Sequence, residues 1–267
     1  MITSIVLPLI GGLGLFLYGM HMMSEGIEKA AGAKLRSILE FFTKNTFSGL
    51  IVGIVFTAII QSSSTCTVMV VSFVNSGLMT LYQAVGVIFG ANIGTSVTSQ
   101  LVAFDLSDYA PVFVLIGVLM MLFTKKLFSQ KIGEVILGFG VLFMGLSNMA
   151  DAMVKIKDVR WLILGLSELS NPVLAVLVGF VLTAVIQSSS VTVSIALLMA
   201  NQGLLDLPVV FYMILGCNIG ACASAMMASI GGKKMAKRAA LIHLLFNVIG
   251  SAIMFVILIF GMDLVKG

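Results

Sequence analysis

The chain contains one stretch of 42 residues twice, and this internal repeat constrains its architecture more than any other feature. Residues 57–98 and 183–224 align without a gap at a constant offset of 126 positions, and sixteen of the 42 positions are identical. The identities fall mainly on polar and glycine positions, including the Q-S-S-S segments 61–64 and 187–190 and the N-I-G segments 92–94 and 218–220. Shared hydrophobicity alone would match leucine and valine instead. We therefore expect two equivalent halves whose polar positions carry the function.

The composition places these halves in a lipid bilayer. Of the 267 residues, 60% are hydrophobic and 10% are charged, and the mean hydropathy is +1.16. Soluble domains carry about 25% charged residues, whereas apolar stretches of about 20 residues predict membrane-spanning helices. The expected fold class is an all-α membrane protein. The net charge of +4 is modest, and no basic stretch is interleaved with aromatic residues, so nucleic acid is not an expected partner.

The first half, residues 1–130, has five expected elements. They are an opening span at 2–24, an interfacial amphipathic helix at 25–44, a re-entrant hairpin at 46–77, a discontinuous helix at 80–104 and a plain span at 110–124. Each apolar arm of the hairpin is too short to cross a hydrocarbon core about 30 Å thick, so we place the Q-S-S-S segment at its tip. Two glycines that bracket Asn92 predict the break in the discontinuous helix.

The second half, residues 131–267, repeats these elements. An opening span is expected at 132–149, followed by an amphipathic stretch, a hairpin at 170–203, a broken helix at 207–230 and a last span at 239–260. Three crossings in each half give the two halves opposite topologies. Eleven of the fifteen Lys and Arg residues then fall on one side of the membrane, which predicts that side to be cytoplasmic and both termini to lie outside.

The polar positions favour an oxyanion site built without charged side chains. Between Thr46 and Phe104 there is no Lys, Arg, Asp or Glu, and between Ser170 and Gly232 the only one is Asp206. Hydroxyl groups and helix amino termini are donors that suit an oxyanion. A buried anion needs compensation, which co-bound sodium ions supply. Inverted repeats with paired polar breaks predict a secondary transporter with its site at the membrane midplane between the repeats. An enzyme is not expected, because the membrane site holds no charged acid–base pair.

At these residues the sequence resembles the type II sodium–phosphate cotransporters, including their bacterial members. That family carries Q-S-S-S in each of two inverted repeats, each followed by a G-x-N-I-G-T element. Here these are Gln61–Ser64 with Gly90–Thr95 and Gln187–Ser190 with Gly216–Gly220, and the segment His243–Asn247 resembles the family's H-x-x-F-N stretch. The resemblance implies sodium-coupled symport of inorganic phosphate in a bacterial plasma membrane, with sodium as the co-transported ion.

The resemblance places the Q-S-S-S hydroxyls at the phosphate and sodium sites, and the amide and hydroxyl oxygens beside the expected helix breaks suit sodium as well. The expected phosphate ligands are Gln61, Ser62, Ser63, Ser64, Thr65, Gln187, Ser188, Ser189 and Ser190. The expected sodium ligands are Ser63, Asn92, Thr95, Ser96, Ser189 and Asn218. In the second copy Ala221 and Cys222 replace Thr95 and Ser96, so we expect a weaker sodium site there.

Two other functions stay open at this point. One is a membrane-embedded regulatory or sensor subunit that binds phosphate without moving it, and the other is a carrier of another small oxyanion. A homodimer is a further hypothesis. Bacterial relatives often continue into a regulatory domain of the PhoU type, which we expect outside these 267 residues.

Overall fold

The computed structural model describes residues 3–31, 39, 43–104 and 106–265, and these form helices joined by turns, with no strand among them. The helices are α1 (Thr3–Ala31), α3 (Thr46–Ile60), α4 (Ser63–Ser76), α5 (Leu81–Ala103), α6 (Ala110–Phe123), α7 (Leu127–Val154), α8 (Arg160–Ser167), α9 (Pro172–Ile186), α10 (Ser189–Asn201), α11 (Leu207–Gly220), α12 (Cys222–Ala228) and α13 (Lys234–Val265). Short 3₁₀ turns cover η1 (Ser107–Tyr109), η2 (Lys155–Asp158) and η3 (Glu168–Ser170). The all-helical prediction is confirmed for the described residues.

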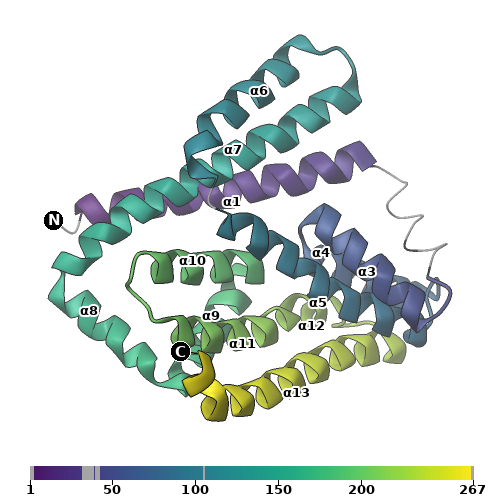
Figure 1. Cartoon of the computed structure of the whole chain (residues 1–267). Coiled ribbons are helices and arrows are strands. Elements are labelled where there is room, and N and C mark those ends of the chain that lie inside the picture. Colours follow the sequence, from purple (N-terminus) through teal and green to yellow (C-terminus); the bar gives the residue numbers. More distant parts are fainter. Residues whose placement is uncertain (1–2, 32–38, 40–42, 105, 266–267) are drawn as a thin grey trace.

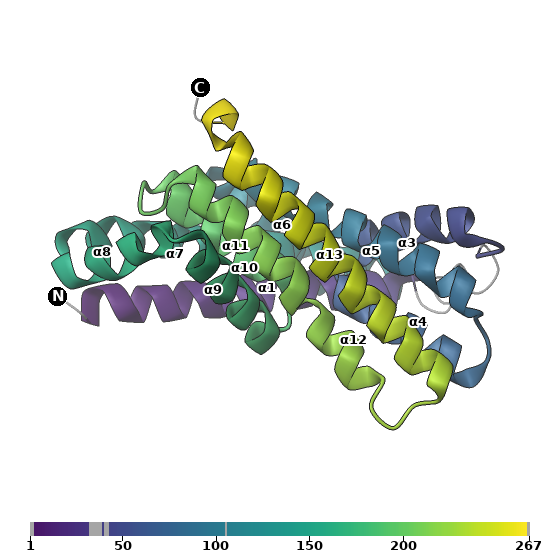
Figure 2. The same ribbon diagram turned by 90° about the horizontal axis from the view of Figure 1, so that it is seen from below.

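Helices α4, α5, α10 and α11 lie between α1 on one side and α13 on the other (Figure 1). The view from below shows α13 crossing the near face, with α1 behind (Figure 2). The segments repeated in the sequence therefore occupy the middle of the molecule, where the polar positions of both halves can meet.

Each Q-S-S-S segment lies at a junction between two helices. Gln61 ends α3 and Gln187 ends α9, and both adopt the left-handed conformation with φ of 60° and 59°. The next residue in each copy, Ser62 or Ser188, caps the following helix by accepting a hydrogen bond from the backbone three residues on. A left-handed residue ends a helix and a serine begins the next, so the same four residues turn the chain in both halves.

Glycines bring α3 against α5, and α9 against α11, at matching positions. A Cβ atom added to Gly53 would lie 2.2 Å from the carbonyl oxygen of Val87, and one added to Gly179 would lie 2.1 Å from that of Met213. Gly179 follows Gly53 by 126 residues, and Met213 follows Val87 by the same offset. These glycines are packing residues, because any side chain at their positions would collide with the backbone of the facing helix.

The break predicted in the helix at 80–104 is wrong. Residues 81–103 form one continuous helix, so Gly90, Asn92 and Gly94 lie inside α5. A Cβ at Gly90 would lie 2.1 Å from the carbonyl oxygen of Leu50 in α3. These glycines therefore permit close helix contact, and the helix stays intact because its backbone hydrogen bonds are kept.

The break predicted in the helix at 207–230 is also placed wrongly. Asn218 and Gly220 lie within α11, and the interruption falls at Ala221, between α11 and α12. Ala221 keeps nearly helical angles, with φ of −60° and ψ of −22°. The two helices together form one apolar stretch from Leu207 to Ala228, so the departure from a regular helix is small.

Two boundaries at the ends of the halves also differ from expectation. The opening helix continues to Ala31, so residues 25–31 belong to it, while residues 32–38 and 40–42 of the predicted amphipathic helix lie outside the described residues. Helix α13 begins at Lys234, which places Lys237 and Arg238 in its first turns. A run of charges among helix-forming residues does not end a helix.

Helices α1 and α7 occupy equivalent positions in the two copies and pack against each other antiparallel. Added Cβ atoms at Gly12, Gly19 and Gly26 would meet backbone or side-chain atoms near 145–149, 138–142 and 131–135 of α7, in that order. Close contact along both helices follows from these glycines.

Five helical stretches of the described chain are long and apolar enough to cross a membrane: α1, α5, α7 with η2, α11 with α12, and α13. The plain span expected at 110–124 is the 14-residue helix α6, about 21 Å long. Its length alone does not make it a crossing. The predicted orientation of the termini depends on this count and stays a prediction.

We expect Gly90→Ala to lower the free energy of unfolding by about 1–3 kcal/mol, because its methyl group would overlap the backbone of α3. Gly250→Ala in α13 is the matched control, since an added Cβ there meets nothing within 4 Å. Thermal unfolding in detergent measures both variants. Equal unfolding midpoints for the two variants would contradict the packing role of Gly90.

Candidate functional site

A cavity of about 250 Å³, lined by both polar and apolar side chains, lies among α4, α5, α10 and α11. Its lining residues are Ser63, Asn92, Thr95, Ser96, Ser99, Ser189, Val193, Leu197, Ile214, Asn218 and Ala221. All six residues expected to bind sodium are therefore brought to one cavity, although they come from two copies that are far apart in the sequence.

Two helix amino termini border this cavity. Ser63 is the first residue of α4, which has 14 residues, and Ser189 is the first residue of α10, which has 13. The first N–H groups of a helix have no partner within it, and each amino terminus carries about half a positive charge. The cavity thus combines two hydroxyl groups with two partial positive charges, an arrangement suited to an anion.

The other residues expected to bind phosphate have structural roles and do not line the cavity. Gln61 and Gln187 end α3 and α9, and Ser62 and Ser188 cap the helices that follow, α4 and α10. The Ser62 hydroxyl donates to Thr65 Oγ1 at 2.8 Å, and the carbonyl oxygen of Ser190, which is 5% exposed, accepts from the Ser194 hydroxyl at 2.7 Å.

Ser64 joins the two copies directly. Its hydroxyl donates to the carbonyl oxygen of Gln187 at 3.1 Å. This hydrogen bond connects the Q-S-S-S segment of one half to the corresponding segment of the other, 123 residues away. The two segments therefore lie against each other beside the cavity.

Two residues near the cavity were not predicted from the sequence. Ser99 lines it, and with Asn92, Thr95 and Ser96 it completes one face of α5 at helical spacing. The assumed helix break hid this pattern. His243 of α13 lies behind Asn92, with its Nε2 atom 3.3 Å from Asn92 Oδ1, and only the folded chain shows that contact.

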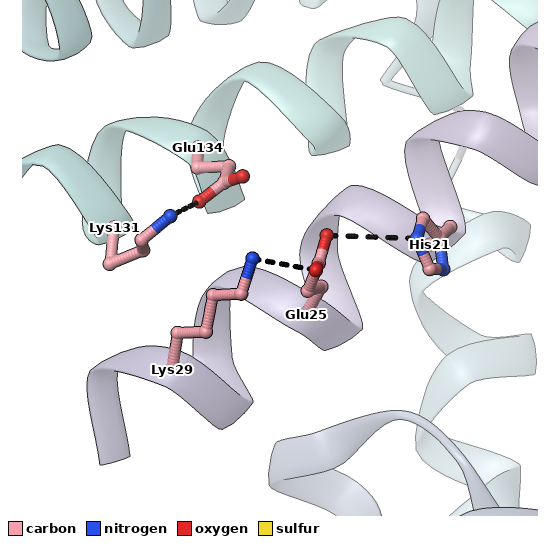
Figure 3. Close-up of polar contacts among 5 residues, drawn as sticks. All are labelled: His21, Glu25, Lys29, Lys131 and Glu134. Carbon is pink, nitrogen blue, oxygen red and sulfur yellow. Dashed lines mark hydrogen bonds and ion pairs between the residues drawn. The ribbon is translucent and has the colours of Figure 1, made fainter. Parts of the chain in front are cut away.

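None of the residues that line the cavity carries a charge. The ion pairs found in the described part of the chain lie on α1 and α7: Glu25 with Lys29 and with His21, and Lys131 with Glu134 (Figure 3). Charge compensation for an ion in the cavity must therefore come from helix dipoles or from a second ion.

A second cavity, of about 300 Å³, adjoins the first. Leu197 lines both. The second cavity lies among the end of α5, α7 and α10, and its polar lining includes Asp108, Ser147, Asn201 and Gln202. Leu197 is therefore the point at which the two cavities approach each other.

Comparison with known proteins supports the resemblance drawn from the motifs. A family model described as "Na+/Pi-cotransporter" matches residues 15–151 and 158–267. A protein of Bacillus subtilis (strain 168) named "Uncharacterized protein YqeW" is 34% identical over 241 residues, which cover 89% of this chain and 78% of that protein. No solved structure was found to be similar to the chain.

Two further relatives have names that describe phosphate transport. "Putative inorganic phosphate export protein YjbB" of Escherichia coli (strain K12) is 29% identical over 249 residues, 93% of this chain and 46% of that protein. "Sodium-dependent phosphate transport protein 2A" of Rattus norvegicus is 38% identical over 111 residues, 39% of this chain and 17% of that protein. The chain spans less than half the length of either protein. With a family match over nearly all of its length and five apolar helical stretches among the described residues, the chain is an integral membrane protein that belongs to the Na+/Pi-cotransporter family.

Proposed function

We propose that this chain moves inorganic phosphate across the membrane together with sodium ions, and that both bind in the cavity between the two copies. The observation that carries this proposal is the meeting of Ser63 and Ser189, each at the start of a helix, in a cavity lined by no charged side chain. The names of two relatives support phosphate as the substrate.

Phosphate binds between the two helix amino termini. The Ser63 and Ser189 hydroxyls and the unpaired N–H groups of the first turns donate hydrogen bonds to its oxygens. Hydrogen bonds to a charged group are about twice as strong as neutral ones. The equivalent positions of the two serines let one tetrahedral ion accept bonds from both halves at once.

Sodium binds to neutral oxygen atoms of α5 and α11 that line the same cavity. The Thr95 hydroxyl donates to the carbonyl oxygen of Ala91 at 3.0 Å, and the Ser96 hydroxyl donates to that of Ile93 at 2.7 Å. Each hydroxyl oxygen keeps lone pairs that can coordinate a cation. The exposed side chain of Asn218 contributes a further oxygen on α11. Ala221 offers no such atom, and sulfur at Cys222 suits sodium poorly.

The two halves, residues 1–130 and 131–267, act as inverted repeats around this site. The antiparallel packing of the equivalent helices α1 and α7 supports this arrangement, and so do the matched glycine contacts of α3 with α5 and α9 with α11. In the membrane, α3–α4 and α9–α10 serve as re-entrant hairpins that bring the Q-S-S-S segments to the midplane. The cavity next to Asp108 is the access route from one side, and it approaches the binding cavity at Leu197.

Sodium-gradient-driven uptake of labelled phosphate into proteoliposomes tests the function. We expect uptake with an inward sodium gradient and little when choline replaces sodium. Because one relative is named as an export protein, the reverse gradient is applied to loaded vesicles as well. Phosphate binding without flux in either direction would favour a sensor, and faster flux of sulfate or a small carboxylate would favour another oxyanion carrier.

The hydroxyl groups of Ser63 and Ser189 should each contribute to phosphate affinity. We expect Ser63→Ala or Ser189→Ala to weaken binding by about 1.5–3 kcal/mol, because alanine keeps the helix but donates no hydrogen bond. Ser72→Ala is the control in the same helix as Ser63, since its hydroxyl donates to the carbonyl oxygen of Val68. Wild-type affinity for phosphate in both site variants would remove these serines from the site.

The sodium requirement should depend on Thr95. We expect Thr95→Val to raise the sodium concentration for half-maximal uptake severalfold, because the substitution keeps the shape and removes one oxygen ligand. Thr67→Val is the matched control: Thr67 is buried in α4, its hydroxyl donates to the carbonyl oxygen of Ser64, and it does not line the cavity. An unchanged sodium dependence in Thr95→Val would exclude this ligand.

A further inference from the structure

The buried face of α13 begins with the small apolar residues Ala236, Ala239 and Ala240 and continues with three polar side chains. Only 11% of the most apolar part of this helix is buried inside the protein. In contrast, His243, Asn247 and Ser251 are almost fully buried, with exposed fractions of 2%, 6% and 5%. Their spacing of four residues places them on one face. A buried polar stripe on a membrane helix marks hydrogen bonds to neighbouring helices.

Two members of this stripe donate hydrogen bonds to backbone carbonyl oxygens. Asn247 Nδ2 donates to the carbonyl oxygen of His243 at 2.9 Å, and the Ser251 hydroxyl donates to that of Leu215 in α11 at 3.0 Å. His243 differs, because its ring reaches a side chain of the cavity. Its Nε2 atom lies 3.3 Å from Asn92 Oδ1.

This contact determines which end of the Asn92 carboxamide remains free. An amide oxygen has no hydrogen, so this contact is a hydrogen bond when His243 carries its proton on Nε2, with Nε2 donating and Asn92 Oδ1 accepting. His243 Nδ1 is then buried without a hydrogen-bond partner among the described residues. The Asn92 Nδ2 atom is buried and has no hydrogen-bond partner among the described residues. The unsatisfied group of Asn92 is therefore a donor of two hydrogens, which suits a phosphate oxygen and repels a cation.

The equivalent asparagine of the other copy has no such restraint. The position 126 residues before His243 is Gly117, in α6, where an added Cβ would contact Leu137 of α7. No imidazole is therefore present at that position, and the Asn218 side chain is exposed in the cavity. Two asparagines that are identical in the repeat meet different surroundings in the fold.

We propose that His243 is a positioning residue that holds the Asn92 carboxamide with its NH₂ group unpaired within the protein and able to donate to phosphate, so that Asn92 recognises the anion and not sodium. This inference rests on the proposed function and revises the sodium role that the sequence suggested for Asn92. Asn218, without a histidine neighbour, keeps its oxygen available for sodium.

Equilibrium binding of radiolabelled inorganic phosphate to the purified protein at saturating sodium tests the inference without depending on transport. The matched variants are His243→Gln, whose amide nitrogen can reach the Nε2 position, and His243→Asn, which is one methylene shorter. We expect His243→Asn to raise the phosphate dissociation constant about tenfold, and His243→Gln to stay near wild type. Ser251→Ala, on the same buried stripe, should leave phosphate binding unchanged.

Asn92→Leu carries the same test from the other partner, in case the His243→Asn protein does not fold. It should raise the phosphate dissociation constant about tenfold. The sodium concentration that half-saturates phosphate binding should stay within about twofold of wild type, when each protein is measured with phosphate at the same multiple of its own dissociation constant. A larger effect on sodium than on phosphate, or equal losses in His243→Asn, His243→Gln and Ser251→Ala, would overturn the inference. Absence of phosphate binding in the wild-type protein would overturn the proposed function as well, whereas wild-type binding with unaffected His243→Asn would overturn the inference alone.

Discussion

The contact of helix backbones at glycine is the interaction on which the rest of the structure depends. Gly53 and Gly90 let α3 lie directly on α5, and Gly179 and Gly216 do the same for α9 and α11. Lipid chains are as apolar as leucine, so close van der Waals packing replaces the hydrophobic effect as the force between such helices. Since α4 and α10 follow α3 and α9 after a short turn, these contacts also determine where the two serines and two helix amino termini lie.

The absence of charge around the cavity is the second constraint. In a medium of low dielectric constant, an anion loses hydration energy that hydroxyl groups and helix dipoles offset only in part. A lysine or arginine in the lining would offset that loss permanently and would retain the anion. Sodium held by neutral oxygens such as those of Thr95 and Ser96 offsets it only while sodium is bound. Binding of one ion then favours binding of the other, which is the thermodynamic basis of coupled transport.

Much of the fold could be predicted because each half repeats the other. The junctions at Gln61 and Gln187, where one helix ends and the next begins at a capping serine, follow from local chemistry that both copies share. The helix breaks at Asn92 and Asn218 were wrong because glycine in an apolar helix can mark either a break or a close contact, and only the facing helix decides. The sequence pattern also could not reveal the contact of His243 with Asn92, which joins positions 151 residues apart.

The dependence of phosphate affinity on sodium tests the central claim most directly. The phosphate dissociation constant of the purified protein would be measured as sodium replaces choline at constant ionic strength. If the two ions compensate each other in one uncharged cavity, that constant should fall by about 5- to 150-fold between choline and saturating sodium. A phosphate dissociation constant that stays the same across this range would contradict the account.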